Sequence, residues 1–464
     1  MKRRLVLATA AALMPLLAAA GLADTVLAPA ERTGLSLTIT QEDAALVRDC
    51  RSANLDKGNL LLVVEGVARQ ARDGTAWLSG NGLAVLEQGF QLAGIDAETL
   101  LAASVGQEVT VVWRDGAGAE RQERAKVVAA GPQPVFQTDG KLVAGTPVRV
   151  LYDSLPPDIR PLPAYRAVLD TVNAGRREVE LAYLTGGLTW QADYVAELNP
   201  AEDRLSLSAW ATLSNNSGAD FPNARVQVMA GDVNVVADGP APPRPMRAER
   251  MLMAKAAMVP AREALGGYHL YTLPQAVSLK DGERKQVALM APQQLATERT
   301  LSLEPMPVQA WRDRWTEQPA QHPVAVLTLK NGGAEPLPAG TIRVFQRAHD
   351  GGATFLGEDR LAATPAGATA RIGLGRAFDV SARRSQTDFT RVSAEITEAA
   401  WEVRLGNAGD APAKVTVRES FGGEWLVLQE SARHAKENAF TAAWTVTVPA
   451  KGETVLTYRA RVKG

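Results

Sequence analysis

The sequence predicts a mainly β protein: a small N-terminal β-barrel-like domain followed by antiparallel β-sandwich domains, the last of them immunoglobulin-like. Three observations support this. The 464 residues, enough for two to four domains, contain eight Asp-Gly or Asn-Gly pairs, the strongest short-range signal for β-hairpins. Apolar and polar residues alternate around several pairs, and helical periodicity is nearly absent after the N-terminus. The pairs begin at Asp73, Asn81, Asp115, Asp139, Asp238, Asp281, Asn331 and Asp350.

Residues 1–23 have the pattern of a secretory signal peptide. A basic start precedes an apolar run from Leu5 to Ala20, and Gly21 and Ala23 place small residues where a signal peptidase reads them. The competing interpretation is a membrane-spanning helix. Such a helix needs about 20 apolar residues, and the run from Leu5 to Ala20 is shorter than that. We therefore expect cleavage after Ala23, no transmembrane segment in the mature chain, and a location in the periplasm or outside the cell.

Charge and cysteine content exclude several classes of protein. Without residues 1–23 the chain has 47 basic and 51 acidic residues, a net charge of −4. It lacks the clustered positive charge that nucleic acid requires, so we expect no nucleic-acid partner. The single cysteine, Cys50, cannot form an intrachain disulfide. We expect it to be a partly buried side chain on a strand, because no sequence feature would lower its pKa for nucleophilic attack.

The first predicted domain covers residues 24–157. Strands are expected over residues 34–40, 44–50 and 59–65. Residues 95–104 form one short helix in this prediction, with Asp96 as its N-cap. About five short strands are expected between Glu108 and Leu151. That density suggests a small closed barrel, because closure removes the edges that short strands otherwise expose.

Residues 160–394 are predicted to form a central β-sandwich. Its sharpest hairpin joins 178–183 to 188–194, where apolar residues alternate on both sides of a Gly-Gly turn. The polar residues of 188–194 share one face, so we expect one face of this sheet to be exposed to solvent. Residues 206–213 and 225–229 are expected to form a further pair.

Residues 237–264 interrupt this domain with a different composition. The segment contains five prolines and four methionines, and prolines block the hydrogen bonds of a β-ladder. With little branched apolar surface to bury, it is predicted to be a mobile insertion. The alternative is a functional role for the methionines, as a soft binding surface or a trap for metal or oxidant.

Residues 395–464 are predicted to form the immunoglobulin-like sandwich. Five alternating segments recur there at roughly 12–15-residue spacing, which is typical of antiparallel sandwiches. Trp401, Trp425 and Trp444 fall on separate segments. We expect these three side chains to be core residues or cross-strand anchors.

Several segments, taken in this order, resemble a known family. They are Tyr183–Tyr194, Trp210–Val233, Tyr268–Pro274, Leu279–Val287, Leu337–Val344, Phe355–Arg360 and Gln386–Phe389. The chain resembles the bacterial family called domain of unknown function 4139 and, more distantly, the mucoidy-inhibitor A proteins that share this domain. The likeness extends from about Leu35 to the end. It implies a secreted or periplasmic β-sandwich protein with a variable Pro/Met-rich insertion, and it implies no catalytic residues.

Motifs for catalysis, cofactors and metals are missing from the sequence. The nucleophile motif Gly-x-Ser-x-Gly, a phosphate-binding loop and a calcium loop do not occur. The four histidines are His269, His322, His349 and His434, and they lack zinc-type spacing. The sequence therefore predicts no catalytic, cofactor-binding or metal-binding residues.

One polar constellation is a candidate site. It consists of Glu358, Asp359, Arg360, Arg383, Arg384 and Asp388. Two carboxylates about 5–10 Å apart would suit glycoside hydrolysis. Neighbouring residues of a strand point to opposite faces, however, so Glu358 and Asp359 cannot serve one site without a bulge. A salt-bridged, solvated sheet face accounts for the same residues.

These observations favour a non-enzymatic binding protein of the bacterial cell envelope, with another protein or a surface polysaccharide as its partner. The alternative is an envelope glycan or peptide hydrolase whose site is assembled only by the fold. A deep cleft that gathers carboxylates or histidines with shifted pKa values would favour the enzyme. A shallow aromatic or apolar surface patch would favour binding.

Overall fold

The computed structural model describes residues 23–92, 94–156, 159–231, 268–308, 319–347 and 352–463. The predicted mainly β fold is confirmed, with 66% strand and 3% helix. Except for Ala23, the predicted signal peptide lies outside the described residues, and so does the predicted insertion 237–264.

Two sheets form a first sandwich. One has the order β1 (Ala23–Leu27), β4 (Gly58–Glu65), β12 (Ala164–Thr171) and β6 (Leu83–Gln91). The other has the order β17 (His269–Thr272), β16 (Phe221–Ala230), β2 (Arg32–Ile39), β3 (Ala45–Leu55), β13 (Gly175–Thr185) and β5 (Trp77–Gly80), with β18 (Val277–Leu279) beside β16. Leu62 of the first sheet and Leu37 of the second belong to one buried core. The strands β1–β6 belong to the predicted first domain, and β12, β13 and β16–β18 belong to the predicted central domain. Strands of both predicted domains therefore lie in the same two sheets.

A long mixed sheet continues the body. Its order is β22 (Ala353–Leu361), β21 (Gly340–Arg347), β14 (Leu188–Leu198), β15 (Arg204–Asn215), β19 (Arg284–Val308), β26 (Ala413–Phe421), β29 (Thr441–Val448) and β28 (His434–Asn438). Two further strands branch from β19: β20 (Val324–Lys330) pairs with β19, and β23 (Thr369–Arg376) pairs with β20. The 25-residue β19 pairs first with β15 and then with β20 and β26, so it joins two sandwiches.

The C-terminal sandwich packs β26, β29 and β28 against a last sheet. That sheet has the order β24 (Val380–Arg391), β25 (Ile396–Asn407), β30 (Gly452–Lys463) and β27 (Glu424–Glu430). Trp401 and Trp444 lie in its core, and the partly buried Trp425 stacks on Phe421 with ring centroids 4.7 Å apart. The predicted role of these three tryptophans as core residues or anchors is confirmed. The sandwich also takes β24, which lies before the predicted start at residue 395.

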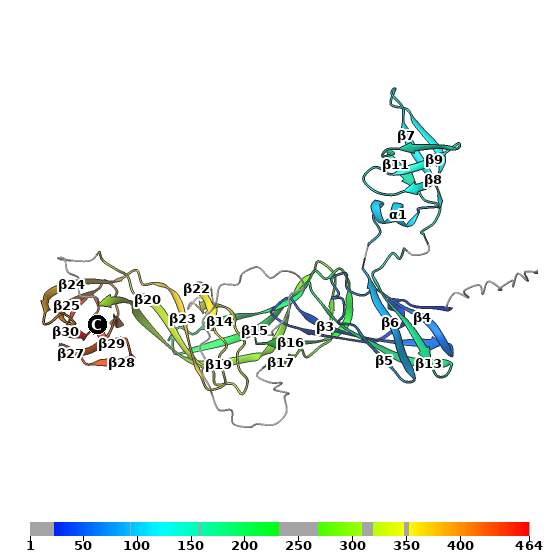
Figure 1. Ribbon diagram of the computed structural model, residues 1–464. Helices are drawn as coiled ribbons and strands as arrows, with labels where there is room; N and C mark the ends of the chain where they lie inside the picture. Colours follow the sequence, from blue (N-terminus) through cyan, green and yellow to red (C-terminus); the bar gives the residue numbers. More distant parts are fainter. Residues whose placement is uncertain are drawn as a thin grey trace, which may run out of the picture.

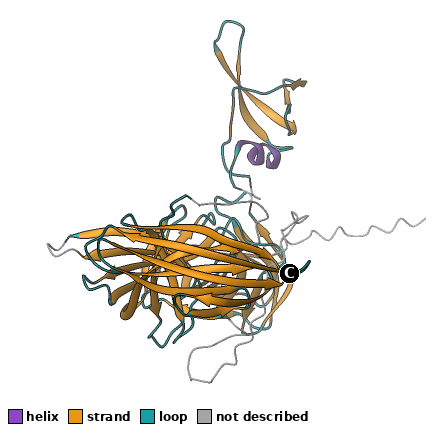
Figure 2. Ribbon diagram, turned by 90° about the vertical axis from the view of Figure 1, so that its left-hand side faces the viewer, coloured by secondary structure: helices purple, strands orange, loops and turns teal. Residues whose placement is uncertain are grey.

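A small domain projects from the body at the end that carries β4 and β6 (Figure 1). It contains α1 (Ala97–Ala103) and a sheet of order β10 (Lys141–Ala144), β9 (Val135–Thr138), β8 (Glu120–Ala129), β7 (Glu108–Arg114) and β11 (Arg149–Leu151). The predicted N-cap is confirmed, because Asp96 Oδ1 accepts a 2.7 Å hydrogen bond from the Thr99 N–H. Figure 2 shows this domain standing clear of the sandwich strands.

The expectation that these short strands close into a barrel is wrong. Among the described residues β10 pairs only with β9, and β11 pairs only with β7, so the sheet is open. Its apolar face includes Val111, Val127 and Phe136, and Leu101 of α1 packs against it. A helix that covers the face of an open sheet buries the same apolar area that closure would bury.

The predicted hairpins of the central domain are also wrong. The strands β13 and β14 do not pair: β13 lies between β3 and β5, whereas β14 lies between β15 and β21. The Gly186-Gly187 turn is a crossing from one sheet to another. A Cβ atom on Gly187, whose φ is +76°, would lie 2.7 Å from the Asn216 backbone, so only glycine fits this crossing. The predicted pair of 206–213 with 225–229 is likewise split between two sheets.

One loop motif occurs three times, at Asn215, Asn331 and Asn407. Each asparagine is almost completely buried at the end of a strand. Its Nδ2 donates a 2.8 Å hydrogen bond to the carbonyl four residues later. Its Oδ1 accepts a bond of 2.9–3.1 Å from the N–H two residues later. We call these three segments the Asn loops. Each joins two strands that do not pair with each other, and the first and third lead the chain from one sheet into another.

Each strand that leads into an Asn loop pairs with a later strand, and a tight turn comes directly before that later strand. Gly282 and Gly367 donate 2.7 Å backbone hydrogen bonds to the carbonyls of Asn215 and Asn331, and both have φ near +76°. The third turn has Lys451 at the corresponding register position, with φ +49°, but the Lys451 N–H donates to the Gly409 carbonyl at 3.1 Å instead of to Asn407. This repeat was not predicted. Its sequence signal is present three times: Asn-x-Ser or Asn-x-Gly, followed within a few residues by proline.

Candidate functional site

The carboxylates of the predicted constellation go to different places. Glu358 pairs with Arg343 on β21, with 3.1 Å between Oε2 and Nε. Asp359 points the other way, and its Oδ2 accepts a 2.7 Å hydrogen bond from the Gly373 N–H on β23. Asp388 forms an ion pair with Arg459 on the C-terminal sandwich. Among the described residues the fold does not assemble this constellation into one site.

Arg384 from the same constellation is buried. Its Nε donates to Glu419 Oε1 at 3.0 Å, inside the C-terminal sandwich. Burial raises the pKa of Glu419 to about 7, although Arg384 and Tyr458 pull it down. The Glu419 carboxylate is 1% exposed, so this pair is closed to a substrate and acts within the core.

Cysteine and histidine chemistry is limited in the described part of the chain. Cys50 lies half-buried on β3, as predicted. Burial raises its pKa to about 11, and the hydrogen bond to Glu180 adds to this, so the thiol is a poor nucleophile at neutral pH. His322 Nδ1 lies 3.0 Å from the carbonyl of Ala377, and His434 pairs with Glu430 at 2.8 Å. His349 lies outside the described residues.

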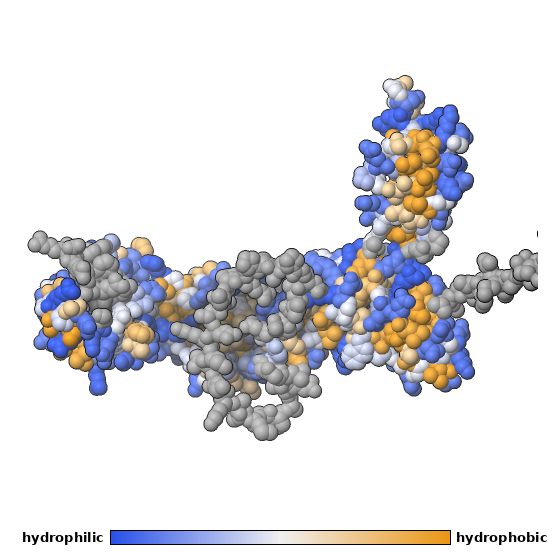
Figure 3. Space-filling view, viewed as in Figure 1, coloured by the Kyte–Doolittle hydropathy of each residue, from blue (hydrophilic) through white to orange (hydrophobic). Residues whose placement is uncertain are grey.

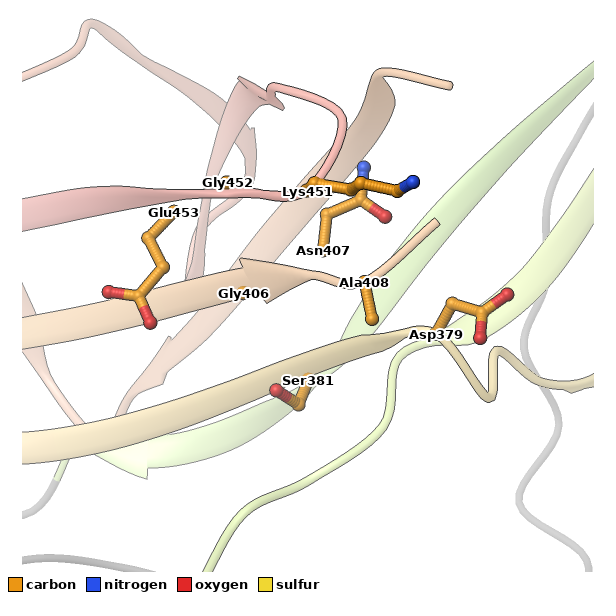
Figure 4. A pocket seen from close by; sticks show the side chains of 8 residues that line it. All are labelled: Asp379, Ser381, Gly406, Asn407, Ala408, Lys451, Gly452 and Glu453. Atoms are coloured by element: carbon orange, nitrogen blue, oxygen red, sulfur yellow. The ribbon is translucent and has the colours of Figure 1, made fainter. Parts of the chain in front are cut away.

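No group of three or more His, Cys, Asp or Glu side chains that could hold a metal occurs among the described residues. One polar hollow lies at the third Asn loop, with a volume of about 490 Å³. Figure 4 shows the carboxylates of Asp379 and Glu453 on opposite sides of it, with Lys451 and Asn407 at its upper edge. The Lys451 Nζ pairs with Asp410 at 2.7 Å. Ser381 also lines the hollow, but among the described residues no hydrogen bond joins its Oγ to Asp379 or Glu453, so the hollow does not pair a nucleophile with a base.

A different arrangement appears on the outer face of the strands β22, β21, β14, β15 and β19. Polar side chains from all five strands form a row of hydrogen bonds across this face. The members are Glu358, Arg343, Asp193, Thr212 and Gln286. Arg343 Nη1 lies 3.1 Å from Asp193 Oδ1, Thr212 donates to Asp193 Oδ2, and Gln286 donates to Thr212 Oγ1 at 3.0 Å. We call this row the polar ladder.

The polar ladder keeps its central carboxylate charged. Burial alone would raise the pKa of Asp193, but hydrogen bonds from Thr212, Gln191 and Arg343 outweigh it and hold the pKa below its ordinary value. On the face of residues 188–194 that was expected to be solvent-exposed, Gln191 is exposed, whereas Asp193 is only 4% exposed. Their partners Arg343 and Glu358 lie 150 or more residues further along the chain, so local alternation could not identify them.

Aromatic side chains flank the polar ladder on the same face. Trp210 is the β15 partner of Asp193 and is 36% exposed. Phe345 and Phe355 are partners on β21 and β22, with ring centroids 5.5 Å apart, and Phe355 is 54% exposed. We call the polar ladder together with these three aromatic residues the ladder face.

Apolar surface is also found elsewhere. Figure 3 shows apolar residues on the visible side of the small domain and at the end of the body near β4 and β6. Leu86 and Leu142 are exposed large apolar residues in these two regions. Polar groups that would specify a ligand are concentrated instead on the ladder face. In the described part of the chain there is no helix of the length and apolar character needed to cross a membrane.

Comparison with known proteins agrees with the fold. The family model described as "Domain of unknown function (DUF4139)" matches residues 179–463, which is more than half of the chain. The search of curated proteins found no match. The matched region runs from β13 to the last strand and contains the whole ladder face and all three Asn loops. This chain therefore belongs to the family called domain of unknown function 4139.

Proposed function

We propose that the chain is an exported, non-enzymatic binding protein of the bacterial cell envelope, and that its ladder face binds a surface polysaccharide. The observation that carries the proposal is the combination of exposed aromatic rings with a continuous row of polar groups on one open sheet face. Aromatic residues supply contact area, and fixed polar groups supply specificity. Export is supported by the signal-peptide pattern of residues 1–23.

The charges of the ladder face favour a neutral, hydroxyl-rich ligand. On the strands β14, β21 and β22 of this face, three carboxylates, on Asp193, Glu197 and Glu358, are matched by guanidinium groups on Arg343, Arg347 and Arg360. Exposed Arg284 on β19 adds a positive charge two residues from Gln286, a small excess that gives little attraction for a polyanion and none for a polycation. A protein partner would bury these charges, and charged residues are depleted at the centre of protein interfaces. Asp193 and Thr212 at the centre of the polar ladder are buried, so the hydroxyl groups of a ligand would replace water at its exposed ends, Glu358 and Gln286, while the charges stay hydrogen-bonded.

The spacing of the aromatic residues favours a polymer. Trp210 and Phe345 lie on opposite sides of β14, next to Asp193 and Glu197. Four residues along a strand and two strand spacings place them about 16 Å apart. A ligand that contacts both must span that distance, so a chain of sugar units fits better than a single one.

The test is a binding measurement with the purified protein and polysaccharide isolated from the envelope of the source bacterium. The double variant Trp210→Ala/Phe355→Ala should weaken binding at least about tenfold, because truncating exposed aromatic anchors removes most contact energy. The matched control is Phe378→Ala, since Phe378 is 91% exposed outside the ladder face. The control should bind like the wild type.

Four outcomes would contradict the proposal. Equal loss in the double variant and the control would remove the role of the ladder face. Capture of an envelope protein by the ladder face, without polysaccharide binding, would assign it to a protein partner. Release of reducing ends from the polysaccharide would show that the chain is a hydrolase. Retention of the chain in the cytoplasm, measured by fractionation, would contradict export.

A further inference from the structure

A second binding site is indicated by a pocket beside the first Asn loop. Its volume is about 470 Å³, within the range of small-molecule sites. Loops from the first sandwich and from the long mixed sheet meet there. Its apolar wall consists of Pro29, Val67, Leu162, Pro163, Ala219 and Pro222. Arg32, Asp220 and Asp281 are the charged residues that line it.

The pocket is preformed by close packing of its walls. Gly66 donates a 2.8 Å backbone hydrogen bond to the Pro163 carbonyl, which ties two walls together. A Cβ atom on Gly66, which has φ +76°, would lie 2.8 Å from Pro29 Cγ. A Cβ on Gly218, at φ +81°, would lie 2.4 Å from Arg69 Cβ. A pocket whose shape is set by backbone contacts loses little entropy when a ligand binds.

Positive charge is in surplus behind this pocket. Asp49 accepts hydrogen bonds from Arg32 at 3.1 and 2.8 Å and from Arg51 at 3.2 and 2.7 Å. The side chains of Arg32, Asp49 and Arg51 are only 9%, 2% and 1% exposed. Two guanidinium groups therefore share one carboxylate. This buried cluster by itself carries one surplus positive charge, and Asp220 and Asp281 line the same pocket with two negative charges, so the lining offers both signs of charge to a ligand.

Arg32 is the member of this cluster that faces the pocket. Its Nε and Nη2 bind Asp49, and Arg51 uses Nη1 on the Leu27 carbonyl at 2.7 Å. Within the described part of the chain, Nη1 of Arg32 has no hydrogen-bond acceptor, and the residue lines the pocket. It thus presents a charged donor beside the apolar wall, where the carboxylate of a ligand can accept a hydrogen bond from it.

The two aspartates supply the opposite charge. Asp220 Oδ1 accepts a 2.8 Å bond from the Asp281 N–H, and Asp281 Oδ1 accepts a 2.9 Å bond from the Gly218 N–H. These bonds fix both carboxylates at the pocket and use one oxygen of each. Their other oxygens are suited to an ammonium group.

We infer that this pocket binds a small zwitterion with an apolar side chain, either a free amino acid or a short peptide with free ends. The carboxylate of the ligand pairs with Arg32, the ammonium group with Asp220 and Asp281, and the side chain lies on the proline-rich wall. This site is separate from the ladder face, so it is independent of polysaccharide binding.

Calorimetric titration of the purified full chain tests the inference with four probes: leucine, Leu-Leu, N-acetyl-leucine and leucinamide. Leucine or Leu-Leu should bind, and whichever binds more tightly identifies the source of the ligand. Removing the positive charge with N-acetyl-leucine or the negative charge with leucinamide should weaken binding at least tenfold. Absence of binding by both leucine and Leu-Leu would overturn the inference.

Variants separate a ligand role for Arg32 from a structural one. Arg32→Gln leaves Asp49 paired with Arg51, so the protein should keep its thermal midpoint while binding falls at least tenfold. Leu162→Trp fills the pocket with Arg32 intact and should also abolish binding. Arg48→Gln removes an exposed ion pair with Glu180 and is the matched control. A lower midpoint with unchanged binding in Arg32→Gln would show that Arg32 only braces Asp49.

Discussion

At the scale of single residues, environment decides what an acidic side chain does. Asp193 and Glu419 are both buried and both bind an arginine, yet their pKa values move in opposite directions. Three hydrogen-bond donors keep Asp193 ionised, whereas burial dominates at Glu419. Their arginines, Arg343 and Arg384, lie 150 and 35 residues away along the chain. Neither pairing could be predicted from local sequence.

The raised pKa of Glu419 predicts a pH dependence of stability. The folded chain holds this proton up to about pH 7, whereas an exposed glutamate loses it near 4.5. Between these values the folded state binds more protons, so the contribution of Glu419 to the free energy of unfolding falls as pH rises. Urea unfolding of the wild type and Glu419→Gln should be measured from pH 4.5 to 8. The free energy of unfolding of the wild type, relative to that of the variant, should fall as pH rises until about pH 7.

The control for this prediction is Glu298→Gln, which removes an exposed pair with Lys414. Its difference from the wild type should stay nearly constant with pH, because surface ion pairs contribute little. A wild-type advantage over Glu419→Gln that grows with pH would contradict the assigned direction.

At the scale of elements, the Asp-Gly and Asn-Gly pairs occur in two structural settings. Asp115-Gly and Asp139-Gly lie in turns between paired strands, both in the small domain. Asp281-Gly lies in a loop that leads from one sheet to another, and Asn331-Gly lies in a loop between β20 and β21, two strands of the long mixed sheet that do not pair with each other. Turn residues specify local φ values. They do not specify whether the next strand packs in the same sheet, and in a sandwich both choices bury an alternating strand equally well.

The repeated Asn loops predict one stabilising substitution. Lys451 occupies the positive-φ place that Gly282 and Gly367 fill in the other two turns. A non-glycine residue costs about 1–2 kcal/mol there, partly offset by the extra entropy of unfolded glycine. Lys451→Gly should therefore raise the free energy of unfolding by about 0.5–1 kcal/mol in denaturant melts.

The reciprocal change is the control. A Cβ on Gly367 would meet no atom within 4 Å, so Gly367→Ala tests φ alone. It should lower stability by about 1 kcal/mol. If Lys451→Gly destabilises the chain, its ion pair with Asp410 contributes more than the backbone strain.

At the scale of the whole molecule, sheets are built from distant segments and domains are not consecutive. The small domain is inserted between β6 and β12, whose ends pair at Gln91 and Ala164. Its core is separate from the core shared by the first sandwich and the long mixed sheet. In contrast, β19 belongs to two sandwiches and connects them.

This organisation predicts that the small domain is dispensable for folding. Replacement of residues 94–158 by a short Gly-Ser linker should leave the thermal midpoint of the remaining chain unchanged, because Gln91 and Ala164 are neighbours that a tight turn can join. Calorimetry and circular dichroism measure this. Deletion of β27 and β28 is the control and should destroy the C-terminal sandwich. A lower midpoint after the linker replacement would mean that the small domain supports the body.

The sequence by itself determined the features that depend on neighbouring residues: the β class, the N-cap of α1, the positions of most strands, the polar face around Asp193 and the family resemblance. Only the tertiary structure decided which strands pair, whether the small sheet closes, and which side chains meet on the ladder face and around Arg32. Alternation records that one face of a strand is buried, but it carries no information about the partner. The partner is chosen by packing between segments at very different separations along the chain, such as 19 residues for Thr212 and Asp193 and 150 residues for Arg343 and Asp193.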